Sequence, residues 1–432
     1  MKNYKILLGI HEIAGYYNGL ESEFKSFGLK ADFVTLQDHR FLYAQPKTTP
    51  FLISLWRKSA NLRAKTPKSQ FFIKSFYVIF NNLLRAIMVL RAVMFYDVII
   101  FSYGITFTDS SLELLFYNIF NIKTIFVFHG TDCRPPYLSA KYCHTETKIN
   151  YSIIKKNTRA QKIKIKKIEK YSSIIINHLP QAQLTQKKFI NVLIMGLPAN
   201  IKPVTNQAKK ITSKNKIKIL HCPSDQNIKG THEIKTIINN LKERGFKIEF
   251  ILLTNVPHSE VLKQIQECDF IIDQMYSCTP MPGLVLEGAY FGKPSVIGGY
   301  FYNQIHNFLE KEDIPPSLYV HPKKIEDAIE KMVVDEDYRK ELGEKANRFI
   351  TEKWNTTQVA KRFLRLMSGD IPTKWWCNPN TSEYVYGGFP DWRTKEIIRN
   401  MIDKFGIESL ELGHNPKLEK SFHEFSLTQS NK

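Results

Sequence analysis

The sequence predicts an α/β protein built from two successive Rossmann-like, doubly wound units, followed by a helical tail. First, short runs rich in Ile, Val and Phe alternate with longer helical patterns, as in a parallel sheet covered by helices. Second, this alternation stops near residue 200 at a polar, lysine-rich stretch and then starts again. Third, 432 residues with 43% hydrophobic and 24% charged residues suit two to three globular domains. This composition excludes disordered, collagen-like and disulfide-scaffold chains.

The apolar runs predict where the strands lie. In the first unit they are Tyr4–Ile10, Asp32–Leu36, Asp97–Ser102, Thr124–His129, Ser173–His178 and Asn191–Met195. In the second unit they are Ile217–His221, Ile248–Leu253, Phe270–Gln274, Pro294–Ile297 and Leu318–His321. Beyond Gly369 a helical pattern returns over Thr394–Phe405. We therefore expect domains at residues 1–200 and 201–368, and a tail at 369–432 that packs back on the first domain.

Most of the net positive charge lies in the first unit. The chain holds 61 Lys and Arg against 41 Asp and Glu, a net charge of +20, and residues 1–200 hold 28 of the former and 11 of the latter. Such a basic surface attracts an anionic partner, either a nucleic acid or a negatively charged membrane. The sequence contains no RNA- or DNA-binding motif, so we expect no nucleic-acid partner.

Two segments concentrate this charge and leave alternatives open. In Phe71–Tyr96 the polar residues Lys74, Asn81 and Arg85 share one helical face, and most of the rest is apolar. This segment is either a helix packed between sheet and core or a helix in a membrane interface. Lys148–Lys170 contains nine Lys or Arg and one Glu. It is either a solvated helix face or a patch that binds anionic lipid or phosphate.

The cysteines and apolar runs bear on the compartment. The six cysteines show no C-x-x-C spacing and no disulfide framework, which suggests reduced thiols in a cytoplasmic protein. The apolar run Ile6–Ile10 is too short for a signal-peptide core. No uncharged apolar run reaches the roughly 18 residues needed to span a bilayer. We therefore expect any membrane contact to be peripheral.

Two loops of the second unit suit a nucleotide. In HCPSDQNIKG, Lys229 supplies a cation and Gly230 allows close approach before a helix that begins near Thr231, a pattern suited to a diphosphate. In SCTPMPGLVLEG, a helix begins at Gly283, and the N–H groups of Gly283 and Leu284 would face a phosphate. Glu287, one turn on, could accept hydrogen bonds from two ribose hydroxyls. The alternative is an ordinary first-turn acid favoured by the helix dipole.

Residues 217–297, with these two loops in order, resemble the nucleotide-sugar-binding domain of retaining GT-B glycosyltransferases of the family-4 type. The resemblance implies two Rossmann-like domains that face a cleft, and a UDP-sugar or GDP-sugar donor. It assigns Lys229 to the diphosphate and Glu287 to the ribose, and by position it places Val256 beside the nucleobase. The chain departs from the family at Ser224, where an arginine is usual, and at Thr279, where a second glutamate is usual. These departures affect the subsite for the donor sugar and its phosphate.

The first unit carries a thinner version of the same resemblance. VFHGTD resembles the family's strand-end histidine segment, which implies that His129 and Asp132 lie at the reacting sugar. Gly15 resembles the first loop, which borders the donor phosphates. A lone strand-end histidine is also often structural. We expect neither a metal nor a cofactor, since basic side chains and helix dipoles stabilise the leaving diphosphate in such enzymes.

The predicted function is glycosyl transfer to a lipid-linked or envelope-glycan acceptor, as in bacterial capsule or lipopolysaccharide synthesis. The enzyme would act in the cytoplasm, peripherally at the inner face of the cell membrane. A non-catalytic glycan-binding or scaffold subunit is the main alternative, because Thr279 replaces the usual glutamate. A nucleotide-sugar epimerase on the same fold is a further alternative.

Overall fold

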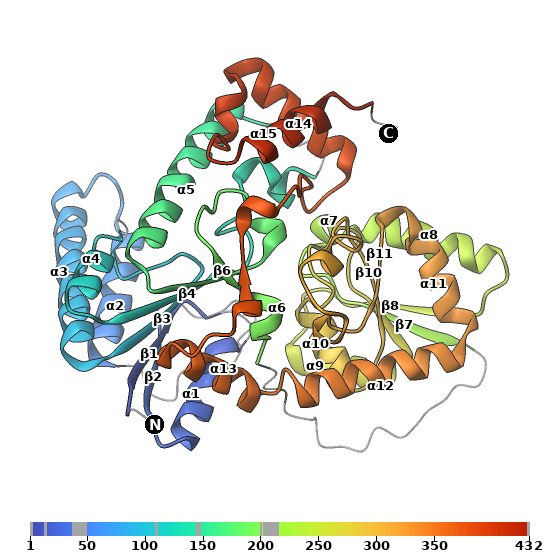
Figure 1. The fold of residues 1–432 in the computed structure, drawn as a ribbon, viewed down its shortest axis with the longest axis horizontal. Helices are drawn as coiled ribbons and strands as arrows, with labels where there is room; N and C mark the ends of the chain where they lie inside the picture. Colours follow the sequence, from blue (N-terminus) through green and yellow to red (C-terminus); the bar gives the residue numbers. More distant parts are fainter. Residues whose placement is uncertain are drawn as a thin grey trace.

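The structure, a computed structural model, describes residues 3–12, 15–36, 50–108, 111–143, 148–198, 201 and 216–429. The described residues form two separate sheets, each at the centre of its own domain (Figure 1). The first sheet has the strand order β12-β6-β5-β4-β3-β1-β2, and the second has the order β11-β10-β9-β7-β8. All strand pairs are parallel except that of β12 with β6.

The first domain is a doubly wound sheet with an apolar layer on each face. Its strands are β1 (Lys5–Ile10), β2 (Lys30–Thr35), β3 (Val98–Ser102), β4 (Lys123–Val127), β5 (Ile174–Asn177) and β6 (Phe189–Asn191). Its helices are α1 (Tyr16–Ser26), α2 (Phe51–Lys65), α3 (Phe71–Phe95), α4 (Glu113–Ile119), α5 (Tyr151–Tyr171) and α6 (Val192–Met195). Alternate residues of the central strands enter the two layers, so β3 and β5 are buried throughout and read as continuous apolar runs.

The second domain repeats this design on a smaller sheet. Its strands are β7 (Ile217–His221), β8 (Ile248–Leu252), β9 (Phe270–Ile272), β10 (Ser295–Gly298) and β11 (Leu318–Val320). Its helices are α7 (Gln226–Lys229), α8 (Thr231–Glu243), α9 (His258–Glu267), α10 (Gly283–Tyr290), α11 (Ile325–Val334) and α12 (Glu336–Glu352). The chain visits β8 on one side of β7 and then β9 on the other, so a topological switch point lies between β7 and β9.

The C-terminal segment returns to the first domain. In α13 (Thr356–Ser368), the ring of Phe363 packs edge-on against Tyr16 and Phe24 of α1. β12 (Trp376–Cys377) then adds an antiparallel strand beside β6. The helices α14 (Asp391–Phe405) and α15 (Pro416–Leu427) lie beside α5 at the end of the molecule coloured red (Figure 1). The fold is therefore two Rossmann-like units with a helical tail.

One predicted strand is wrong, and the others each overlap an observed strand. The segment Asn191–Met195 contains only the end of β6, and α6 follows it. Asn191 acts as the N-cap of this helix, because its side chain accepts a hydrogen bond from the N–H of Leu193. The lysine-rich linker falls almost entirely on residues 199–200 and 202–215, outside the described residues.

Candidate functional site

The sequence-predicted nucleotide residues gather at the carboxyl ends of β7 and β9, beside the switch point of the second sheet. Ligands of doubly wound sheets bind at this position, because the loops on either side of the switch point diverge. The burial of Cys222, then the nearby carboxylates of Glu287 and Asp273, raise the pKa of its thiol to about 11. Cys222 directly follows β7, so both carboxylates lie close to this edge of the sheet.

Lys229 is paired with an acid that the sequence reasoning did not identify. Its Nζ lies 3.0 Å from Oδ2 of Asp273, the residue that follows β9. The Asp273 side chain is 2% exposed and that of Lys229 is 17% exposed. The pair therefore joins the two loops. A diphosphate at this point would share the ammonium group with Asp273. The feature of the sequence that could have identified Asp273 as a site residue is its position directly after a buried strand.

Gly230 is required by the local backbone. It adopts φ +70° between α7 and α8, and a Cβ at this position would lie 2.4 Å from Cγ of Met275. Buried His221 fixes the loop from below, because its ring nitrogens bond to the Ile272 carbonyl and the Thr231 hydroxyl, each at 2.8 Å. The short helix α7, which ends at Lys229, and the start of α8 are thus held against the ends of β7 and β9.

The start of α10 is open, as an anion site at a helix N-terminus requires. Its N-cap, Pro282, makes no side-chain capping hydrogen bond. Gly283 is exposed, and apart from its chain neighbours and the backbone of its own helix, no atom of the described residues lies within 4 Å of the position that its Cβ would occupy. The first amide groups of the helix, those of Gly283 and Leu284, are placed to face a ligand phosphate.

Glu287 binds His258, a second partner that sequence reasoning missed. Oε1 of Glu287 lies 2.7 Å from Nε2 of His258, the first residue of α9. The hydrogen bond to this carboxylate raises the pKa of His258. Val256 and Leu284 pack against one small apolar cluster with Cys222, which gives an apolar surface beside Glu287. Ribose and base binding at this surface remains a prediction for Glu287 and Val256.

The raised pKa of His258 predicts a pH-dependent stability. Folding favours the protonated ring, so its contribution is complete below the ordinary histidine pKa of 6.5 and is lost as pH rises through the raised value. We expect His258→Gln, which keeps a donor but cannot gain a proton, to destabilise the protein at pH 6 and to have a smaller effect at pH 8.5. Urea unfolding at both pH values measures this difference. The exposed His232→Gln variant is the control, and an equal effect of His258→Gln at both values would contradict the assignment.

The two positions that depart from the family pattern have polar surroundings of their own. Ser224 is exposed in the loop before α7. Thr279 belongs to a tight turn, in which the Ser277 hydroxyl donates to the Thr279 carbonyl at 2.7 Å and accepts from its N–H at 3.1 Å. The Thr279 hydroxyl accepts from the N–H of Met281 at 3.3 Å. Thr279 therefore shapes the approach to α10 and brings no charge to it.

In the first domain, His129 and Gly15 are brought together. Gly15 is the N-cap of α1 with φ +79°, and the ring of the next residue, Tyr16, lies edge-on against His129 at 5.6 Å. Burial, then the neighbouring His11, lower the pKa of His129 to about 3, so the imidazole is neutral near pH 7. Its Nε2 is buried without a hydrogen-bond partner among the described residues.

Asp132 holds the loop that carries His129. Its carboxylate accepts hydrogen bonds from the N–H groups of His129, at 3.0 Å, and Gly130, at 2.7 Å. Burial raises the pKa of Asp132 to about 6, against the opposing effect of these bonds. The contacts make Asp132 a positioning residue for His129, and its participation in chemistry remains a prediction.

Two first-domain residues that the sequence reasoning missed reach the second domain. The guanidinium of Arg134 lies 2.5 Å from Sγ of Cys278, and Nε2 of His178 lies 2.6 Å from the Cys278 carbonyl. Cys278 directly precedes Thr279, so these contacts place the first domain against the loop that leads to α10. His178 directly follows β5, and Arg134 lies in the segment after β4; a position after a strand end was the signal available in the sequence. Within the described ranges, no three or more His, Cys, Asp and Glu residues gather as metal ligands would.

Comparisons with known proteins identify the fold. No family model matches the chain, and no curated protein matches its sequence. The structure is similar to that of a mutant of S. aureus TarM in complex with fondaparinux, alpha-GlcNAc-glycerol and UDP, with a TM-score of 0.52 and 10% identity over 84% of this chain and 99% of that one. Another TarM structure has a TM-score of 0.49 at 12% identity, covering 84% of this chain and 98% of its own. The structure of Anabaena Alr3699/HepE in complex with UDP and glucose has a TM-score of 0.47 at 12% identity, covering 85% of this chain and 100% of its own. The fold is of the GT-B type.

Proposed function

We propose that the protein is a glycosyltransferase that moves a sugar from a UDP-sugar or GDP-sugar to a lipid-linked or envelope-glycan acceptor. The observation that carries this proposal is the arrangement of Lys229, the open start of α10 and Glu287 at one switch point. A cation, free amides and a carboxylate in this order match a diphosphate followed by a ribose. The likeness to a structure solved with UDP supports the same class of donor.

The proposed reaction depends on how the site stabilises the charge of the leaving group. As the glycosidic bond breaks, negative charge develops on the departing diphosphate, and Lys229 and the amides of α10 would stabilise it without a metal. His129, neutral and held by Asp132, would lie at the sugar and accept or donate a hydrogen bond through Nε2. Retention of configuration and membership of the family-4 type are part of this proposal, from the resemblance of residues 217–297.

Glu287→Ala tests the donor site. We expect the variant to lose about 1.5–3 kcal/mol of affinity for the matching nucleotide, the range for hydrogen bonds to a charged group. Calorimetry with UDP and GDP measures the loss, after a thermal-shift panel of nucleotide sugars has identified the base. Glu267→Ala, at the exposed end of α9, is the control. Unchanged affinity in Glu287→Ala would remove this residue from the site.

A non-catalytic glycan-binding or scaffold subunit is the second candidate, and Thr279 is the observation that favours it. This second function would be supported if a nucleotide sugar binds but no free nucleotide is released with any of the acceptors offered. Release of nucleotide that depends on an acceptor would support glycosyl transfer.

We also propose that the enzyme lies on the inner face of the cell membrane through α3 and α4. By length and composition α3 could cross a membrane, and 28% of its apolar window is buried. Three of its polar residues contact the rest of the protein: Asn81 is buried, Arg85 stacks over the ring of Trp56 in α2 at 5.6 Å, and Lys74 donates to the Thr66 carbonyl at 3.3 Å. Leu84, Met88 and Ala92 are buried on one face, but most of the other large apolar side chains of α3 are exposed, where a water-facing helix would carry polar residues.

The outward apolar face continues onto α4 and lies far from the second domain. Its most exposed members on α3 are Phe72 (87%), Ile79 (69%), Met94 (68%) and Phe71 (68%). α4 and its flanks add exposed apolar side chains, namely Leu112, Leu115, Phe116, Ile119 and Phe120. α3 and α4 lie at the outer side of the first domain, so this surface could enter a membrane while the second domain remains in water (Figure 1).

A further inference from the structure

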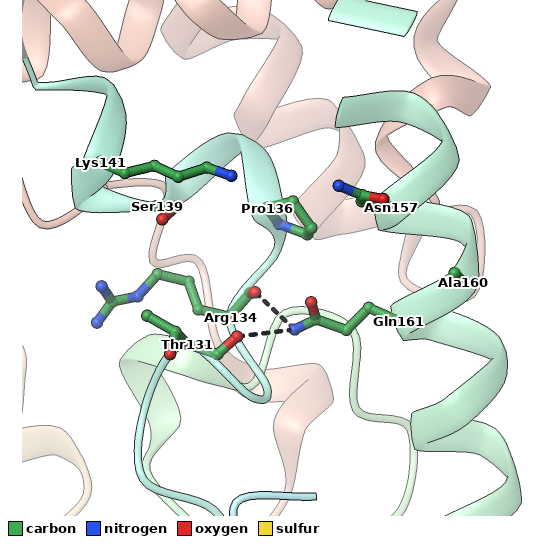
Figure 2. Close-up of a pocket in the computed structure, with 8 residues that line it drawn as sticks. All are labelled: Thr131, Arg134, Pro136, Ser139, Lys141, Asn157, Ala160 and Gln161. Atoms are coloured by element: carbon green, nitrogen blue, oxygen red, sulfur yellow. Dashed lines mark hydrogen bonds between the residues drawn. The ribbon is translucent and has the colours of Figure 1, made fainter. Parts of the chain in front are cut away.

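A hollow in the first domain lies beside the loop that carries His129. It has a volume of about 350 Å³. Its walls are the end of that loop, the two short turns that follow it, and one face of α5 (Figure 2). The lining residues are Thr131, Arg134, Pro136, Ser139, Lys141, Asn157, Ala160 and Gln161.

The lining is suited to an anion. Among the described residues it contains Lys141 and Arg134 but no carboxylate, and its other polar groups are hydroxyls and amides. In Figure 2 the side chains of Lys141 and Asn157 extend toward each other from opposite walls. The Gln161 amide is fixed on the floor, where it donates to the carbonyls of Arg134 at 2.7 Å and Thr131 at 3.4 Å. The lining residues that the structure describes include no aromatic ring on which a neutral sugar could stack.

One wall of the hollow carries further positive charge. α5 forms one wall, and the end of this helix that lies near the hollow carries the exposed residues Lys155, Lys156 and Arg159. The acid of this helix, Glu169, lies at its far end and accepts hydrogen bonds from the N–H groups of Gln186, at 2.6 Å, and Lys187, at 2.9 Å. It therefore does not offset the positive potential at the hollow.

One loop residue connects the hollow to the second domain, and another connects it to the surroundings of His129. The Arg134 guanidinium points away from Lys141 and contacts Cys278, beside Thr279 in the second domain (Figure 2). The Thr131 hydroxyl lies 2.5 Å from the Tyr103 hydroxyl, and the Tyr103 ring lies 5.0 Å from that of His11, the neighbour of His129. A molecule held in the hollow would thus have one end beside the proposed reaction centre.

We propose that this hollow binds a phosphoryl group of the acceptor, a phosphomonoester or phosphodiester, through Lys141, Asn157 and the hydroxyls of Ser139 and Thr131. The inference rests on the proposed function and narrows its acceptor to a phosphorylated class. A phosphate anchored here places a neighbouring hydroxyl of the acceptor toward His129. The phosphate could belong to a soluble or polymeric polyol phosphate or to a lipid-linked phosphate.

Binding of sn-glycerol 3-phosphate to the full chain tests the inference. Saturating UDP is added so that Lys229 and α10 are occupied, and phosphorus NMR or calorimetry measures the dissociation constant. We expect Lys141→Ala and Asn157→Ala each to raise this constant, Lys141→Ala by roughly tenfold or more because a charged partner is lost. Lys170→Ala is the control, since it is exposed on the same helix about 20 Å along the axis from Asn157. Neutral glycerol should not bind.

A second arm separates the two phosphate sources. A polyprenyl phosphate in phosphatidylcholine vesicles is compared with the same vesicles without it, for the wild type and Lys141→Ala. Binding that needs the polyprenyl phosphate and Lys141, without glycerol 3-phosphate binding, indicates a lipid-linked acceptor. Glycerol 3-phosphate binding that needs Lys141 indicates a soluble or polymeric phosphate.

The outcomes also separate this inference from the proposed function. No phosphate binding in either arm, or equal binding by Lys141→Ala and the wild type, overturns the inference, and the proposed function survives if nucleotide sugars still bind. Phosphate binding that depends on Lys141 without any nucleotide binding overturns the proposed function and supports the phosphate site.

Discussion

Replacing four exposed apolar residues of α3 with glutamine should abolish binding of the protein to membrane vesicles. The residues are Phe72, Phe76, Ile79 and Leu83, which are between 55% and 87% exposed. Burial of one such side chain contributes about 1.5–3 kcal/mol, so full insertion of four would contribute roughly 6–12 kcal/mol. Even partial insertion is the largest single effect that we expect. Because these side chains face outward, the variant should keep the stability of the wild type.

Co-sedimentation with two vesicle types measures the effect. Vesicles of phosphatidylcholine with phosphatidylglycerol should bind the wild type more strongly than phosphatidylcholine alone, and salt should weaken only this difference. Replacing the exposed Lys58, Arg63 and Lys65 of α2 with glutamine is the matched control, because it should remove the salt-sensitive part alone. Vesicle binding that survives in the α3 variant would contradict the proposed membrane surface.

The structure bears on the alternatives that the sequence left open for α3, and its place in a membrane interface remains a prediction. The sequence allows either a packed helix or an interfacial helix, and the structure shows one buried face and one exposed face. The period of Lys74, Asn81 and Arg85 predicts a shared polar face, but periodicity does not say whether that face meets water or protein. Arg85 lies inward because Trp56 of α2 offers its ring, and this contact depends on how two helices pack.

For the basic helix α5, too, the sequence alone does not predict which side chains are exposed. Lys162 lies within its basic run, yet its side chain is buried, and its Nζ lies 2.9 Å from the Leu184 carbonyl and 2.8 Å from Nδ1 of His414. Burial lowers the pKa of Lys162 to about 8. A tail residue 252 positions away supplies this contact, which a local reading of charge does not predict. Lys162 is therefore not part of an exposed lipid-binding or phosphate-binding face.

At the proposed nucleotide site, too, local features could be predicted from the sequence and contacts between distant residues could not. The strands and helix starts that carry Lys229, Gly283 and Glu287 follow from local patterns, since apolar runs, glycines and prolines act within a few residues. Their partners Asp273 and His258 are 44 and 29 positions away and become neighbours only through strand order. The contacts of Arg134 and His178 with Cys278 depend further on how two domains meet.

Lys229→Ala should have two separable effects because of its pairing with Asp273. It removes a cation from the proposed diphosphate site, so affinity for UDP or GDP should fall and affinity for the nucleoside should change little. It also leaves the carboxylate of Asp273, 2% exposed, without its ion-pair partner. Breaking a buried pair on one side destabilises a protein by about 3–5 kcal/mol. We therefore expect a large loss of stability in urea unfolding together with weaker diphosphate binding.

The double variant Lys229→Ala, Asp273→Asn separates these two effects. Removing the orphaned charge should restore most of the free energy of unfolding, because a neutral amide costs far less to bury than an unpaired carboxylate. Diphosphate affinity should remain low, since the cation is still missing. Calorimetry with UDP, GDP and the matching nucleosides measures this. Recovery of both stability and diphosphate affinity in the double variant would show that Lys229 serves only to neutralise Asp273, and would leave the open start of α10 as the sole candidate for the phosphates.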